Sequence, residues 1–165
     1  MVRGRRGGFT LVELMMVVII LGIISSIGAG VLLQANRYFL MTRTRIDLQK
    51  EARAALYVMT REIRQAKSAT IVIDRLSTTQ PFYSRITFTT IDGVTMSFQQ
   101  SGNQIQQVVH GGTRALSKNL NYLAFTFPRT DDMTILSVAV TLQEAIYQGQ
   151  TKALHMASEN VQVMN

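Results

Sequence analysis

Apolar side chains dominate the chain from Phe9 to Leu33, and Glu13 is the one charged residue in that run. A helix of 25 residues is about 37 Å long, and about 20 apolar residues are enough to cross the hydrocarbon core of a bilayer. The pattern therefore predicts one transmembrane helix over residues 9–33.

Beyond Leu33 the apolar positions repeat with the period of an amphipathic helix. No Pro or Gly occurs between Val31 and Lys67. We therefore predict that the same helix continues over residues 34–67 and packs its apolar face on a sheet. That face consists of Leu48, Ala52, Leu56, Met59, Ile63 and Ala66.

Residues 68–165 have the pattern of short strands joined by turns. Asp92-Gly93 is a strong hairpin signal, and Ser101-Gly102-Asn103 is a second turn. The predicted fold class is α+β: one long N-terminal helix, its first half transmembrane, packed on an antiparallel β-sheet or on two small sheets. The predicted strands are 69–73, 86–90, 94–98, 105–109, 120–127, 136–142 and 154–163.

The phenylalanines of this part fall mostly on alternating strand positions, which predicts a hydrophobic core in place of a surface for stacking bases. They are Phe82, Phe88, Phe98, Phe125 and Phe127.

The net charge of +7 is concentrated near the N-terminus. Residues 1–8 carry +3, residues 9–67 carry +4, and residues 68–165 are neutral. A neutral C-terminal part argues against nucleic acid as a partner. Arginines ahead of an apolar run are retained on the cytoplasmic side, so we expect the C-terminal part to be exported.

The basic leader, residues 1–8, does not have the order of an ordinary signal peptide, in which the apolar region precedes the cut. Here the leader ends at Gly7-Gly8 and the apolar run follows. A cut after Ala29, which would release a secreted domain, stays open as an alternative.

The carboxylate of Glu13 within the apolar run has two interpretations, and its charge alone favours neither. It can reach the headgroups from a position about 6 Å inside Phe9. Alternatively, a cut between Gly8 and Phe9 creates an α-amino group, and that group on a neighbouring subunit would neutralise the Glu13 carboxylate in an apolar environment.

Gly8-Phe9-Thr10-Leu11-Val12-Glu13-Leu14 resembles the cleavage and methylation signature of type IV prepilins and type II secretion pseudopilins. The resemblance implies removal of residues 1–8 by a prepilin peptidase, N-methylation of Phe9, and a role for Glu13 in setting the register between subunits. It implies a structural protein that needs no cofactor. The protein is expected to cross the inner membrane once, with its N-terminus in the cytoplasm. It is then expected to enter a pilus or pseudopilus. The expected partners are the peptidase, other major and minor subunits, and assembly platform proteins.

The segment 52–66 looks like the helix end of J-type minor pseudopilins and W-type minor pilins, which implies a minor subunit in a priming or tip complex. Two alternatives stay open. One is a ligand- or DNA-binding minor pilin of an adhesion or competence system, and the other is a generic signal-anchored exported protein.

Gly22, Ser26 and Gly30 are spaced four apart, which places them on one helix face where membrane helices can approach closely. General enrichment of Gly in membrane helices is the alternative. Gly28-Ala29-Gly30 has the weakest helix propensity, and local loosening there is a hypothesis.

Candidate chemistry is sparse, and we expect no enzyme activity. There is no Cys, and neither His110 nor His155 has a Cys or acidic partner at ligand spacing. Asp131 and Asp132 are weak candidates for calcium, but no regular oxygen-ligand loop surrounds them, and a solvated turn is the alternative.

Overall fold

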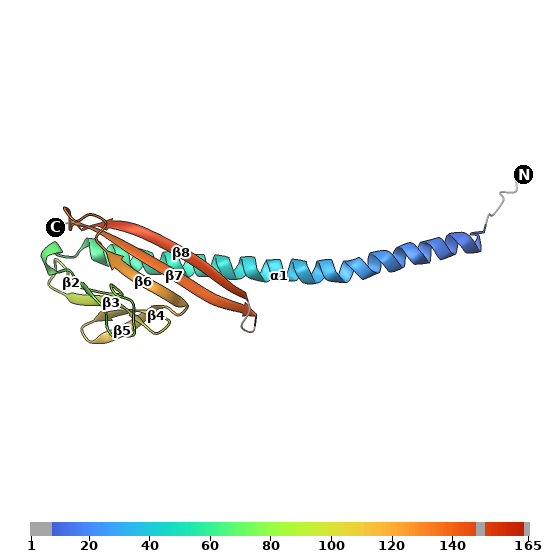
Figure 1. Ribbon diagram of the computed structural model, residues 1–165. Coiled ribbons are helices and arrows are strands. Elements are labelled where there is room, and N and C mark those ends of the chain that lie inside the picture. Colours follow the sequence, from blue (N-terminus) through green and yellow to red (C-terminus); the bar gives the residue numbers. More distant parts are fainter. Residues whose placement is uncertain (1–7, 148–150, 164–165) are drawn as a thin grey trace, which may run out of the picture. The chain divides into compact units, whose positions relative to one another are not determined.

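The computed structural model describes residues 8–147 and 151–163. The chain divides into two compact units, Met1–Leu40 and Met41–Asn165. Helix α1 runs from Leu11 to Arg64 and contributes to both (Figure 1). The elements after it are η1 (Ser68–Thr70), β1 (Val72–Asp74), β2 (Arg85–Thr89), β3 (Thr95–Ser101), β4 (Gln104–Val109), β5 (Gly112–Ser117), β6 (Leu120–Thr126), β7 (Ile135–Tyr147) and β8 (Thr151–Gln162).

The first unit presents the apolar part of α1 with its side chains exposed. Among the described residues none of its most apolar stretch is buried, and Leu32, for example, is 72% exposed. By length and composition α1 is able to cross a membrane. Contiguous apolar surface on this scale marks a membrane or a protein contact.

The second unit packs the C-terminal part of α1 against its strands, which lie alongside that part of the helix in Figure 1. The predicted apolar face is confirmed, because all six of its residues are at most 5% exposed. Phe88, Phe98 and Phe125 complete the interior, and Phe88 and Phe98 have ring centroids 6.1 Å apart.

The strands form two antiparallel sheets, as the sequence allowed. One is a five-stranded meander in the order β1-β2-β3-β4-β5, and the other has the order β6-β7-β8. Both predicted turns are present. Gly93 and Gly102 have φ angles of 81° and 56°, which glycine adopts without steric cost.

The ends of α1 differ from the predicted Phe9 and Lys67. At the C-terminal end, the Lys67 N–H donates to the Thr89 carbonyl at 2.9 Å, and the Ile91 N–H donates to the Gln65 carbonyl at 2.9 Å. Pairing with the end of β2 therefore replaces the last helical turn.

Three further details differ from prediction. Residues 69–73 form the short helix η1 and part of β1 where a single strand was expected. The strand β5 was not predicted. Phe82 is 64% exposed, since its ring lies 4.1 Å from the Arg75 guanidinium on the surface and not in the core.

Candidate processing and assembly site

The peptide bond between Gly8 and Phe9 lies in non-helical chain ahead of α1, which begins at Leu11. Phe9 is 85% exposed, and a Cβ added to Gly8 would meet no atom within 4 Å. An exposed, non-helical bond is accessible to a peptidase. The rest of the expected leader, residues 1–7, lies outside the described residues.

Thr10 and Glu13 form a capping box at the start of α1. The Thr10 N–H and its Oγ1 hydroxyl donate to Glu13 Oε2 at 2.9 and 3.1 Å. The Glu13 N–H donates in return to Thr10 Oγ1 at 3.4 Å. This arrangement satisfies backbone donors that the first helical turn leaves unpaired, and it places a carboxylate at the positive end of the helix dipole.

The capping box leaves the Glu13 carboxylate able to accept further hydrogen bonds. Both contacts from Thr10 reach Oε2, while a carboxylate offers about four lone-pair positions on two oxygens. A cut between Gly8 and Phe9 would also leave the Thr10 N–H in place. Capping within the chain and pairing with an external cation are therefore compatible.

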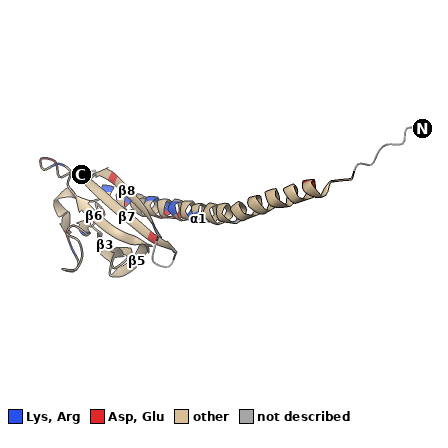
Figure 2. Ribbon diagram, turned by 45° about the vertical axis from the view of Figure 1, so that its right-hand side comes forward, with Lys and Arg blue, Asp and Glu red and all other residues tan. Residues whose placement is uncertain are grey.

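Glu13 is isolated from other charge along the helix. The next charged residue is Arg37, and α1 carries its basic residues further toward the C-terminus (Figure 2). An unpaired carboxylate in the apolar part of a bilayer costs roughly 3 kcal/mol, which a cation supplied by another molecule would reduce.

Gly22, Ser26 and Gly30 lie on the exposed surface of α1. A Cβ added at either glycine would meet nothing within 4 Å. The Ser26 hydroxyl donates to the Ile23 carbonyl at 2.9 Å, so its polar group is satisfied within the helix. This face is open to close approach by another helix.

Asp131 and Asp132 contact groups of their own loop. Asp131 Oδ1 lies 3.6 Å from Arg129 Nε, and Asp132 Oδ1 accepts hydrogen bonds from the Thr134 N–H at 2.9 Å and from the Thr134 hydroxyl at 2.5 Å. The Thr134 hydrogen bonds lower the pKa of Asp132. Across residues 8–147 and 151–163, no three His, Cys, Asp or Glu side chains are grouped to hold a metal ion.

Two polar contacts of α1 were not predicted from the sequence. The spacing Thr-x-x-Glu is the signature of a capping box and was sufficient to find Thr10. Glu51 of α1 accepts the Lys118 N–H at 2.8 Å and the Asn119 side-chain amide at 3.2 Å. No local pattern signals this second contact, because the partners are 67 and 68 residues apart.

A long helix with an exposed apolar part, packed further along on antiparallel sheets and preceded by an accessible Gly8-Phe9 bond, defines a pilin-like architecture. Residues 3–29 match the family model described as the prokaryotic N-terminal methylation motif. The match supports the type IV pilin family, whose members are structural, and it does not separate J-type from W-type subunits. No curated protein and no solved structure matches the chain significantly.

Proposed function

We propose that the chain is the precursor of a filament subunit. A prepilin peptidase cuts between Gly8 and Phe9 and methylates the new amine of Phe9. The mature subunit stays in the inner membrane through residues 9–33, with residues 68–165 exported, until it joins a type IV pilus or a type II secretion pseudopilus.

The observation that carries this proposal is the position of the methylation motif relative to α1. The motif matches residues 3–29, and within it the Gly8-Phe9 bond precedes the helix by two residues. Cleavage there removes the arginine-rich leader and keeps the whole apolar helix. A cut after Ala29 would instead discard most of the apolar surface that α1 exposes.

In the filament, Glu13 pairs with the amine of Phe9 on a neighbouring subunit, and the face of Gly22, Ser26 and Gly30 packs against another helix. The free capacity of Glu13 Oε1 supports the first role, and the four-residue spacing of the small residues on one helix face supports the second. The contact between Glu13 and the amine lies in a low-dielectric environment, where a paired charge is far more favourable than a single one.

We further propose a minor subunit within a priming or tip complex. The support is the resemblance of segment 52–66 to J-type pseudopilins and W-type pilins. On this proposal the chain is far less abundant in the filament than the major subunit, which quantitative mass spectrometry of sheared filaments measures directly.

The test is expression of the full chain in membranes with and without a prepilin peptidase, followed by intact mass and N-terminal sequencing. The expected product begins at N-methyl-Phe9. Gly8→Val should block the cut because a branched side chain next to the scissile bond would hinder its approach to the peptidase. Gly4→Val is the matched control and should be processed. A mature chain that begins after Ala29, or an uncut chain, would reject the proposal.

A further inference from the structure

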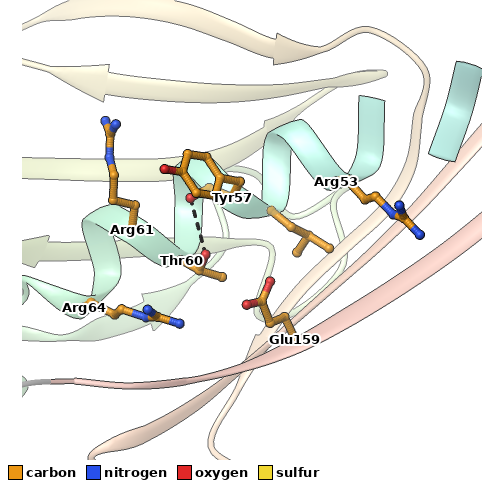
Figure 3. A pocket seen from close by; sticks show the side chains of 7 residues that line it. Arg53, Tyr57, Thr60, Arg61, Arg64 and Glu159 are labelled. Atoms are coloured by element: carbon orange, nitrogen blue, oxygen red, sulfur yellow. Dashed lines mark hydrogen bonds between the residues drawn. The ribbon is translucent and has the colours of Figure 1, made fainter. Parts of the chain in front are cut away.

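A basic groove lies between α1 and β8 within the second unit (Figure 3). Its volume is about 300 Å³. The buried residues Leu56 and Thr60 form part of its lining, and the polar lining includes Arg53, Arg61 and Arg64 of α1 and Glu159 of β8. In Figure 3, Glu159 extends from β8 toward α1, with Arg53 and Arg64 on either side of it.

The groove carries excess positive charge. Arg61 has an ion pair, since its Nη2 lies 2.6 Å from Glu62 Oε1. Among the described residues, Arg53 and Arg64 have no ion pair, and the only carboxylate that lines the groove is Glu159. Guanidinium groups that are held apart in this way bind carboxylates through paired N–H donors.

The strand beside these arginines has a free edge in the part of the chain that the structure describes. β8 is the terminal strand of the sheet β6-β7-β8, pairs with β7 alone, and runs for 12 residues. Proteins normally protect long edges with proline, bulges or several charges. Residues 151–162 contain no proline, and their only charged residues are Lys152 and Glu159.

The spacing of the arginines fits an extended chain. Arg61 lies eight positions after Arg53 along α1 and Arg64 lies eleven positions after it, which correspond to rises of about 12 and 17 Å. Alternate side chains of a strand face the same side, and positions i and i+4 are about 13 Å apart. Two acidic residues four apart can therefore reach both ends of the groove, with a neutral residue opposite Glu159.

We propose that the groove is a docking site for an extended acidic polypeptide segment that adds as a fourth strand to β8. Backbone hydrogen bonds to the free edge supply the affinity. The arginines supply the preference for two acidic side chains that lie four residues apart on one face of the added strand. This inference holds or fails independently of any cut between Gly8 and Phe9.

The test uses the full chain in detergent micelles and a fluorescent peptide, Val-Asp-Val-Thr-Val-Asp-Val, with binding followed by anisotropy at low salt. The matched peptide carries Asn in place of both Asp residues. The double variant Arg53→Gln/Arg64→Gln is compared with Arg114→Gln, an exposed arginine on β5, which is also an edge strand. Circular dichroism establishes that each variant is folded.

We expect the Asp peptide to bind at least tenfold more tightly than the Asn peptide. Arg53→Gln/Arg64→Gln should remove that preference, and Arg114→Gln should keep it. Hydrogen exchange should slow in β8 and not in β5. Absence of peptide binding, equal affinity for the two peptides, or unchanged exchange in β8 would overturn the proposal. So would arginine-dependent binding of oligo-dT or inorganic phosphate without binding of the peptide.

Discussion

Thr10 and Glu13 cap the first turn of α1 reciprocally: the Thr10 N–H donates to the Glu13 carboxylate at 2.9 Å, and the Glu13 N–H donates to the Thr10 hydroxyl oxygen at 3.4 Å. The residue proposed to bind a neighbouring subunit therefore also has a role within its own chain. Two substitutions separate these roles, because only one of them removes the negative charge.

Thr10→Val removes the hydroxyl while preserving the shape of the side chain. Loss of an N-terminal cap costs about 1 kcal/mol, so exchange of the first-turn amides should accelerate about fivefold. Glu13→Gln keeps an oxygen that accepts the Thr10 N–H and should change this exchange little. Hydrogen–deuterium exchange of the full chain in micelles measures both, and Thr42→Val, at an exposed position of α1, is the control.

In filament assembly the two substitutions should rank the other way, with Glu13→Gln having the larger effect. Glu13→Gln removes the charge that would pair with the Phe9 amine and should abolish incorporation into sheared filaments, while Thr10→Val should reduce it only modestly. Normal incorporation of Glu13→Gln would show that the carboxylate serves the cap alone.

The apolar face of α1 was predictable because helical period and burial coincide over five positions from Leu48 to Ile63, and Ala66, just past the end of the helix, is buried as well. Strand β5 could not be predicted, since the sequence Gly112–Ser117 has no apolar alternation and its first four residues are exposed. The basic groove was also beyond prediction. It depends on bringing Glu159 beside Arg53 and Arg64, and no local pattern sets the position of β8 relative to α1.

Glu51 connects α1 to the turn between β5 and β6 through Lys118 and Asn119. A hydrogen bond to a charged group contributes about 1.5–3 kcal/mol. Glu51→Ala should therefore lower the free energy of unfolding of the full chain by about 2 kcal/mol, and Glu51→Gln by less, because the amide oxygen still accepts. Urea titration in detergent measures the difference.

The control for Glu51 is Asp47→Ala. Asp47 lies on the same helix, and its carboxylate is 3.8 Å from Lys50 Nζ at an exposed position. An exposed pair of this kind contributes about 0–1 kcal/mol. If Asp47→Ala and Glu51→Ala lower the free energy of unfolding equally, the contact between Glu51 and the turn stabilises the fold no more than an exposed ion pair does.

Asp74 and Arg85 pair on neighbouring strands, and Arg85 Nε donates to Asp74 Oδ1 at 2.6 Å. Hydrogen bonding to Arg85 lowers the pKa of Asp74 below its ordinary value. A carboxylate with a lowered folded-state pKa stabilises the fold above its unfolded-state pKa, and this contribution is lost as the pH falls through the folded-state pKa.

Asp74→Asn should therefore cost up to about 1 kcal/mol at neutral pH, since the pair is partly exposed. The difference from the unsubstituted chain should shrink steadily below about pH 4. Thermal unfolding across this pH range provides the measurement, with Asp131→Asn as the control at an exposed loop position. A difference that persists unchanged at low pH would assign the effect to packing and not to charge.

The turn between β4 and β5 is strained at His110. His110 and Gly111 have φ angles of 50° and 80°, and Val109 pairs with Gly112 across the turn, so the connection is a two-residue hairpin of type I′. Asn is favoured at the first position of such turns, whereas a β-branched residue is strongly disfavoured there.

His110→Asn should raise the free energy of unfolding by about 0.5 kcal/mol, and His110→Val should lower it by about 1 kcal/mol or more. Thr113→Val is the control, because it introduces the same residue at an exposed strand position two residues beyond the turn, where valine is well accommodated. Urea midpoints of the full chain give the comparison. If valine costs as much at Thr113 as at His110, the backbone angle of His110 is not the cause of the loss.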